Sequence, residues 1–165
     1  MGNSPKVLIM MGSDSDLQVM QEAADILAKF GVPYEIRISS AHRSPVRTMS
    51  LASEAAGRGI RIIIAGAGMA AHLAGVVAAK TTLPVIGVPM PGGALNGVDA
   101  LFSTVQMPAG IPVATMAIGK AGAKNAGIFA VQVLALTDAR LDAALGLYRR
   151  EMDQEVEAKD AALQG

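Results

Sequence analysis

The sequence predicts an α/β fold: a single three-layer α/β/α domain with a doubly wound parallel sheet, plus a C-terminal helix. Short runs of β-branched residues alternate with segments of helical periodicity, which is typical of βαβ units. The 165 residues suffice for one domain, and no repeat, low-complexity tract or linker interrupts them. We therefore expect one domain over residues 1–165, in which residues 138–160 form a helix that packs on neighbouring subunits.

Strands are predicted where a short apolar run is bounded by turn residues, at residues 6–10, 34–38, 61–65, 85–88 and 113–118. The first helix follows from apolar residues at helical spacing, namely Leu17, Met20, Ala24 and Leu27. The second helix has Ser44 as its N-cap and Pro45 at its first position. Further helices are expected at residues 71–80, 97–105 and 122–136.

The apolar content of the chain indicates contacts between subunits. Hydrophobic residues make up 52% of the chain and the mean hydropathy is +0.41. The last predicted helix carries a one-sided apolar face, formed by Leu141, Leu145, Tyr148, Met152 and Val156. Because monomers seldom expose large apolar patches, we expect a homo-oligomer.

Composition excludes several classes of function. Lysine and arginine together number 14, as do aspartate and glutamate, so neither a nucleic acid nor a membrane is an expected partner. The absence of cysteine excludes a disulfide framework, a thiolate metal site and a cysteine nucleophile. The apolar stretch at residues 59–79 contains Arg61 and His72, and the N-terminus lacks the apolar region of a signal peptide. We expect a cytoplasmic protein.

In doubly wound sheets, ligands bind at the carboxyl ends of the strands, which directs attention to three loops. The first loop, Gly12-Ser13-Asp14-Ser15-Asp16, offers a glycine, two hydroxyls and a helix start to an anion, and Asp16 can accept hydrogen bonds from ribose hydroxyls. The alternative is local: Ser15-Asp16-Leu17-Gln18 fits a capping box. Both interpretations stay open on this loop alone.

The second loop is Ser39-Ser40-Ala41-His42-Arg43-Ser44-Pro45. It places an imidazole, which titrates nearest neutrality, beside a guanidinium that can hold phosphate through two hydrogen bonds. A lone histidine is more often structural than catalytic. His42, however, lies among polar loop residues, so that a functional and a structural role are equally open.

The third loop, Ala65-Gly66-Ala67-Gly68-Met69-Ala70-Ala71-His72, has small side chains that let the backbone approach a ligand or another chain. It matches the dinucleotide-binding pattern only at its first two glycines. His72 either anchors the loop or contacts substrate. With the two histidines far apart in the sequence and no other ligand at suitable spacing, we expect no metal site. Motifs of hydrolases and zinc enzymes are also absent from the sequence.

Six segments in order carry a family resemblance: GSDSD, SSAHRSP, AGAGMAAHLAG, GVP, VQMPAGIPVATMAIG and GAKNAG. Together they resemble the class I 5-(carboxyamino)imidazole ribonucleotide mutases of bacterial purine synthesis, over residues 6–136. Class II relatives, which carboxylate aminoimidazole ribonucleotide with carbon dioxide, tend to have lysine after the histidine and fewer glycines in the third loop. Arg43 and the AGAGMAAHL segment favour class I.

The resemblance implies an isomerase that acts on a small ribonucleotide in a homo-octamer, with His42 as the acid/base. It also implies that no metal and no cofactor are needed. In the implied mechanism, the substrate releases carbon dioxide inside a closed site and a carbon of its imidazole ring attacks that carbon dioxide. His42 relays the proton that this ring carbon loses. The expected substrate-binding residues are Ser13, Ser15, Asp16, Ser40, Ala41, Arg43, Gly66, Ala67, Gly68, Met69, Ala71, His72 and Leu73. Among them, Arg43 and Ser13 are expected to hold the phosphate.

The chain departs from the family pattern at three places. Met69 stands where glycine is usual, and Ala74 stands where proline is usual. Residues 91–94 replace a more polar segment of a loop that is expected to close over the substrate. Met69 is in a position to narrow the cavity.

Other functions are possible for this flavodoxin-like fold, because fold alone does not fix function. A receiver domain needs an aspartate at the end of the third strand, where this chain has Ala65 and Gly66. A flavodoxin usually brackets its flavin with aromatic residues, which are only 3% of this chain. Two alternatives to the class I mutase remain: a class II aminoimidazole ribonucleotide carboxylase, and a module that binds a ribonucleotide without turnover.

Overall fold

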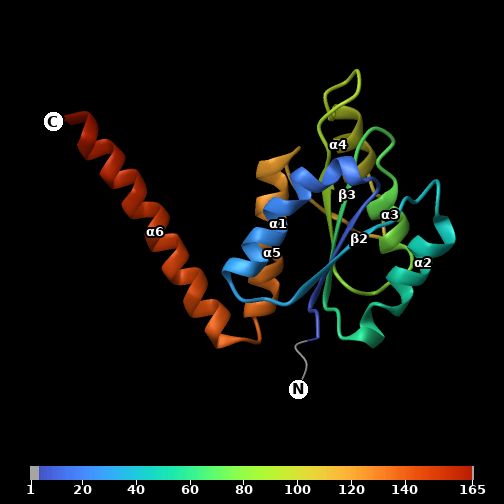
Figure 1. Ribbon diagram of the computed structural model, residues 1–165, viewed down its shortest axis with the longest axis horizontal. Helices are drawn as coiled ribbons and strands as arrows, with labels where there is room; N and C mark the ends of the chain where they lie inside the picture. The colour runs from blue at the N-terminus through green and yellow to red at the C-terminus, as the bar shows by residue number, and fades with distance from the viewer. Residues whose placement is uncertain (1–3, 165) are drawn as a thin grey trace. The chain divides into compact units, whose positions relative to one another are not determined.

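The computed structural model describes residues 4–164 and contains a five-stranded sheet (Figure 1). All strand pairs are parallel, in the order β2-β1-β3-β4-β5. The strands are β1 (Val7–Met11), β2 (Tyr34–Ile38), β3 (Ile62–Ala67), β4 (Val85–Pro89) and β5 (Ala114–Thr115). The predicted doubly wound α/β fold is confirmed, and its order is the flavodoxin-like one, with the direction of winding reversing between β1 and β3.

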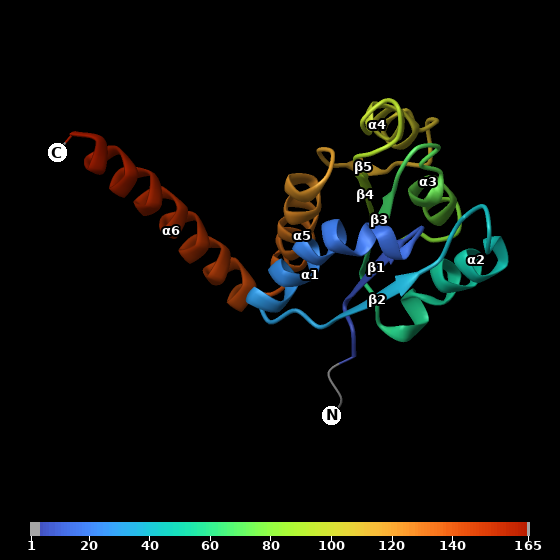
Figure 2. The same ribbon diagram turned by 45° about the horizontal axis from the view of Figure 1, so that its top comes forward.

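Helices cover both faces of this sheet (Figures 1 and 2). On one face lie α1 and the first part of α5, while α2 and α3 cover the other. The helices are α1 (Leu17–Lys29), α2 (Pro45–Glu54), α3 (Leu73–Ala78), α4 (Val98–Val105), α5 (Lys120–Ala135) and α6 (Ala139–Gln164). Two short 3₁₀ turns, η1 (Asp14–Asp16) and η2 (Ala56–Arg58), precede α1 and follow α2.

The central strands are buried on both faces, as expected for a parallel sheet between two helical layers. Every residue of β1 is fully buried. Alternate residues such as Leu8 and Ile63 share a hydrophobic core with Ala52 of α2 and Val77 of α3. On the other face, Gly127 of α5 lies so close to α1 that an added Cβ would stand 2.9 Å from the Ala23 carbonyl oxygen. The loops of the site are therefore attached to a sheet that is closely packed on both faces.

Two elements are shorter than the sequence predicts. The fifth strand has only Ala114 and Thr115, against the expected residues 113–118. Beyond it, the N–H groups of Met116 and Gly119 still donate to β4 carbonyls, at 2.9 Å each, but they are three residues apart while their acceptors are two apart. The chain therefore bulges and leaves the strand conformation. Helix α3 begins only at Leu73, because residues 68–72 form the irregular loop that enters the site.

The chain divides into two compact units, one up to Ala130 and one from Val131 onward. The expectation of a single domain over residues 1–165 stays a prediction, and residues 1–3 and 165 lie outside the described part. Within the second unit, Leu141 and Tyr148 of α6 are buried, whereas Leu147 and Val156 are exposed. None of the helices at residues 4–164 is long and apolar enough to cross a membrane.

Candidate functional site

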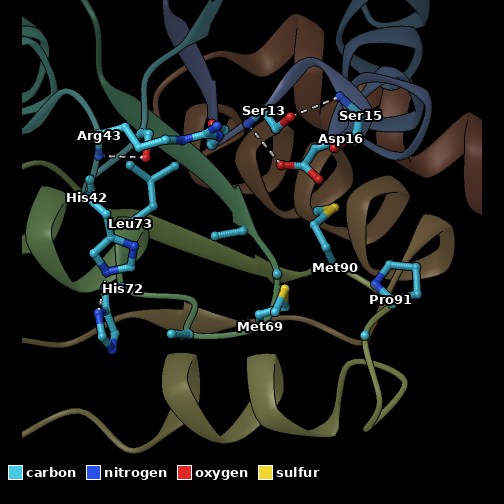
Figure 3. A pocket seen from close by; sticks show the side chains of 18 residues that line it. Ser13, Ser15, Asp16, His42, Arg43, Met69, His72, Leu73, Met90 and Pro91 are labelled. Atoms are coloured by element: carbon cyan, nitrogen blue, oxygen red, sulfur yellow. Dashed lines mark hydrogen bonds between the residues drawn. The ribbon is translucent and has the colours of Figure 1, made fainter.

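Four loops meet at the carboxyl ends of the strands, around a cavity of about 450 Å³ (Figure 3). They follow β1, β2, β3 and β4, so the cavity lies at the point where the winding of the sheet reverses. Twelve of the predicted site residues line the cavity: Ser13, Ser15, Asp16, Ser40, Ala41, His42, Arg43, Ala67, Gly68, Met69, His72 and Leu73. Topology has gathered them from distant parts of the chain.

The loop after β1 is held by a capping box that starts at Ser13. The Ser13 N–H donates to Asp16 Oδ2 at 3.2 Å, and the Ser15 N–H donates to Ser13 Oγ at 3.4 Å. The expected box at residues 15–18 is wrong, because the turn η1 precedes α1 and moves the cap two residues back. The capping groups also face the cavity, so capping and ligand binding are not exclusive here.

Asp16 is half-buried, and its environment favours the neutral carboxyl. Burial raises the pKa of Asp16 above its ordinary value, although hydrogen bonds from Ser13 and Ser15 lower it in part. The carboxyl oxygens lie at the cavity wall (Figure 3). A ligand with hydroxyl groups can donate hydrogen bonds to such oxygens.

The loop after β2 is fixed by serine hydroxyls. The Ser40 N–H donates to Ser44 Oγ at 3.0 Å, and the Arg43 N–H donates to Ser40 Oγ at 3.1 Å. Ser44 occupies the predicted N-cap position and Pro45 the first helical position. The Ser44 hydroxyl, however, donates to the Ser40 carbonyl at 3.1 Å and so closes the loop rather than capping α2. This turn presents His42 and Arg43 to the cavity.

Arg43 links the first two loops. Its Nη2 donates to the Gly12 carbonyl oxygen at 3.3 Å, across 31 residues of sequence. The side chain is exposed, and most guanidinium N–H groups remain available for an anion. Ser13, Ser15 and Ser40 add hydroxyls to the same wall. The cavity thus has one cationic, hydroxyl-rich side suited to a phosphate.

His42 and His72 form a direct pair on another side of the cavity (Figure 3). His42 Nε2 lies 2.7 Å from His72 Nδ1, with the ring planes at 81°. One nitrogen donates and the other accepts, so a single proton lies between the rings. Sequence reasoning treated the two histidines as far apart, but parallel packing of β1 between β2 and β3 brings their loops together.

The third loop contributes backbone and small side chains from Ala67 to Leu73. Two of the predicted contacts lie behind this wall. Ala71 is buried, and Gly66 in β3 packs against Met20 and Met90, whose side-chain atoms would stand 2.4 and 2.8 Å from an added Cβ. Gly66 therefore supports the cavity floor instead of facing the cavity.

The fourth loop supplies Met90, Pro91, Gly92 and Gly93 to the wall. The sequence analysis expected residues 91–94 to close over the substrate, but it did not name these four residues as substrate-binding. Gly12 and Ala70 also line the cavity, and both belong to loops that the sequence analysis selected, although neither was named as a substrate contact. The rule that selected the other loops applies equally after β4, which pairs with β3, so this topology was the available signal. Among residues 4–164, no group of three histidine, aspartate or glutamate side chains comes together to hold a metal ion.

Comparison with known families bears directly on this cavity. The family model described as AIR carboxylase matches residues 6–155, which include all four loops. The chain belongs to this family.

Members of the AIR carboxylase family with curated names resemble this chain over nearly its whole length. The N5-carboxyaminoimidazole ribonucleotide mutase of Mycobacterium leprae is 53% identical, covering 99% of this chain and 95% of that protein. A mutase of the same name from Pyrococcus horikoshii is 55% identical, covering 97% and 89%. The phosphoribosylaminoimidazole carboxylase of Schizosaccharomyces pombe is 56% identical over 92% of this chain, but the match is 27% of that longer protein.

A solved structure agrees with the AIR carboxylase fold. PurE of Treponema denticola superposes with a TM-score of 0.88 and 30% identity, covering 98% of this chain and 99% of that one. Met69, which stands where the sequence resemblance implies glycine, has a φ of 54°. Glycine enters this left-handed region freely, so the backbone at position 69 has a conformation that a glycine would also adopt.

Proposed function

We propose that this protein is an N5-carboxyaminoimidazole ribonucleotide mutase, an isomerase of purine biosynthesis. It converts 5-carboxyamino-1-(5-phosphoribosyl)imidazole to 5-amino-1-(5-phosphoribosyl)imidazole-4-carboxylate. The observation that carries the proposal is the cavity in which an imidazole pair, a guanidinium and a hydroxyl-rich wall meet, at the point where the winding of the sheet reverses. Relatives at 53–55% identity over most of the chain carry that name.

Substrate binding uses the polar side of the cavity. Arg43 and Ser13 hold the phosphate, Ser15 and Ser40 add hydrogen bonds, and Asp16 accepts from ribose hydroxyls. Contacts to the phosphate and ribose are remote from the reacting atoms. They supply binding energy that places the imidazole ring against His42.

The chemistry needs one proton carrier. The bond between the exocyclic nitrogen and the carboxylate breaks, carbon dioxide leaves, and that nitrogen gains a proton. Ring carbon 4 then attacks the carbon dioxide, a carbon–carbon bond forms, and carbon 4 loses its proton. His42 donates the first proton and accepts the second, so the enzyme ends the cycle unchanged. His72 orients the His42 ring through their shared hydrogen bond.

A second candidate is direct carboxylation of aminoimidazole ribonucleotide by carbon dioxide. The matching family model is described as AIR carboxylase, and the S. pombe relative is named a carboxylase. Arg43 and the glycine-rich third loop favour the mutase. A module that binds ribonucleotide without turnover is the remaining alternative.

Initial rates with two substrates separate these functions. We expect fast conversion of the carboxyamino ribonucleotide, followed by ultraviolet absorbance, and slow conversion of aminoimidazole ribonucleotide with bicarbonate at physiological concentration. The reverse preference supports the carboxylase. Binding of the ribonucleotide with neither conversion supports the module.

We also propose that the protein forms a homo-octamer and is cytoplasmic, which the family resemblance implies. Exposed apolar side chains support assembly: Leu136, Leu147, Val156 and Leu163 in the second unit, and Val98, Phe102 and Val105 on α4. No nucleic-acid or membrane partner is included in the proposal, and no metal or cofactor is assigned a role.

A further inference from the structure

Met69 has an unfavourable backbone conformation at the edge of the cavity. Among residues 4–164, it is one of two non-glycine residues with positive φ, at 54°, the other being Asn96 at 49°. A residue with a Cβ incurs a steric cost there that glycine does not. The side chain is 64% exposed, so burial of the thioether in the protein core does not offset that cost.

The side chain instead lies at the rim between the third and fourth loops. In Figure 3, Met69 lies between His72 and Pro91, on the side of the cavity away from Ser13. A Cβ built on Gly93 would stand 3.5 Å from Met69 Cγ. The neighbouring wall residues are Gly68, Ala70, Gly92 and Gly93, which have small side chains or none. Between His72 and Pro91, Met69 is therefore the bulky side chain on this part of the rim.

Carbon dioxide makes confinement necessary at such a rim. The free molecule has no net charge and offers weak hydrogen-bond acceptors, so charged groups do not hold it. An enzyme retains it by closing a small, dry space around it. A thioether side chain is flexible and apolar, and it can fill an irregular gap without binding water.

We propose that Met69 is a positioning residue that closes the rim against the Gly92–Gly93 segment and retains carbon dioxide between its release and its recapture. The inference rests on the proposed mutase function. The bulk of the Met69 side chain, and not its left-handed backbone conformation, retains the carbon dioxide. Glycine would adopt that backbone conformation more easily. Bulk and backbone conformation can therefore be separated by substitution.

The test measures retention of a label. Substrate carrying ¹³C in its carboxylate is converted by the full-length protein in unlabelled bicarbonate with carbonic anhydrase, and the ¹³C content of the product is read by mass spectrometry. Wild-type protein and Met69→Leu, which keeps the bulk, should retain most of the label. For Met69→Ala and Met69→Gly, the ratio of lost to retained label should rise about tenfold, the effect of removing a few methylene-sized groups from a pocket.

Two controls exclude other causes of lost label. Met69→Gly relieves the left-handed conformation, so its thermal midpoint should not fall, and loss of folding is not an explanation for lost label. Asn96→Gly relieves the other left-handed residue, whose side chain is outside the cavity lining, and should retain label like the wild type. Unchanged retention in Met69→Ala and Met69→Gly overturns the inference while the mutase function stands. No conversion by the wild-type protein overturns the mutase function itself.

Discussion

Nε2 of His42 and Nδ1 of His72 lie 2.7 Å apart, although 30 residues separate them in the sequence. The ring centroids are 4.8 Å apart and the planes nearly perpendicular, so the in-plane nitrogen of one ring points at the edge of the other. Each histidine follows a different strand of the sheet. The hydrogen bond restricts the rotation of the His42 ring. An acid/base needs such a restriction, because it must meet its substrate in one geometry.

His72 substitutions test that restriction. An asparagine can present a polar atom near the position of Nδ1, whereas leucine fills the space without a hydrogen bond. We expect His72→Asn to stay within a few-fold of wild-type kcat and His72→Leu to lose about tenfold, the effect of a hydrogen bond of about 1.4 kcal/mol. Steady-state kinetics at several pH values measure both. Equal activity of the leucine variant and the wild type would remove His72 from the mechanism.

Arg43→Ala should mainly weaken substrate binding. Loss of one charge-assisted contact to phosphate costs about 2 kcal/mol, or roughly thirtyfold in affinity. Arg47, an exposed arginine on α2 outside the cavity lining, provides the matched control, and Arg47→Ala should bind as the wild type does. Calorimetric titration with the ribonucleotide measures both affinities. If both variants bind equally well, the phosphate site lies elsewhere.

Glu35 on β2 should make stability depend on pH. Partial burial raises the pKa of its carboxyl, but hydrogen bonds from Arg58 and Arg37 outweigh burial and leave the pKa below the ordinary value. A lowered folded-state pKa stabilises the protein above the unfolded value of about 4.3, and the stabilisation is lost as pH falls through the folded value. Glu35→Gln should therefore lower the free energy of unfolding by about 1 kcal/mol at pH 7, which corresponds to a fall of about 2–4 °C in the thermal midpoint.

The difference between wild type and Glu35→Gln should shrink as the pH falls below 4.3, near the ordinary glutamate value. Glu22 provides the control, because its pairing with Lys120 is long, at 3.9 Å, and exposed. Glu22→Gln should shift the midpoint little at any pH. A pH-independent difference for Glu35→Gln would show that its charge is not the cause.

The exposed part of α6 should matter for assembly. Met152 and Val156 continue the apolar face of Leu141 and Tyr148, but Val156 is 65% exposed. Val156→Glu should shift the proposed octamer toward smaller species in light scattering coupled to size exclusion, because a charge is costly in an apolar interface. Gln154→Glu, on the opposite face of the helix, should leave the octamer intact. A monomeric wild-type protein at micromolar concentration would contradict the proposed assembly.

Much of the fold follows from local pattern. The second strand begins at Tyr34 and ends at Ile38, as predicted, because Gly31 and Pro33 mark its start and the polar serines mark its end. The fifth strand was overestimated, since the apolar run at residues 113–118 does not reveal the bulge opposite β4. The pattern of apolar residues indicates which residues can be buried. The hydrogen bonds between neighbouring strands decide where a strand ends.

The site was predictable where a loop carries polar residues or a run of small residues, and not where an ordinary core side chain forms the wall. Arg43 and Asp16 were recognised by their chemistry, and both line the cavity. Met90 has an ordinary core side chain, which is 3% exposed, and only the adjacency of β3 and β4 places it in the wall. The contact between His42 and His72 depends on the same tertiary adjacency, so no local spacing predicts it.

The most direct test of the acid/base role is to compare binding and turnover in His42→Asn. Asparagine keeps polarity and approximate size but does not carry a proton near neutral pH. The folded variant should bind the ribonucleotide with nearly wild-type affinity in a calorimetric titration, while kcat for the carboxyamino substrate falls by at least about a hundredfold. Turnover near the wild-type rate would contradict the account and pass the role to His72, Asp16 or the substrate itself.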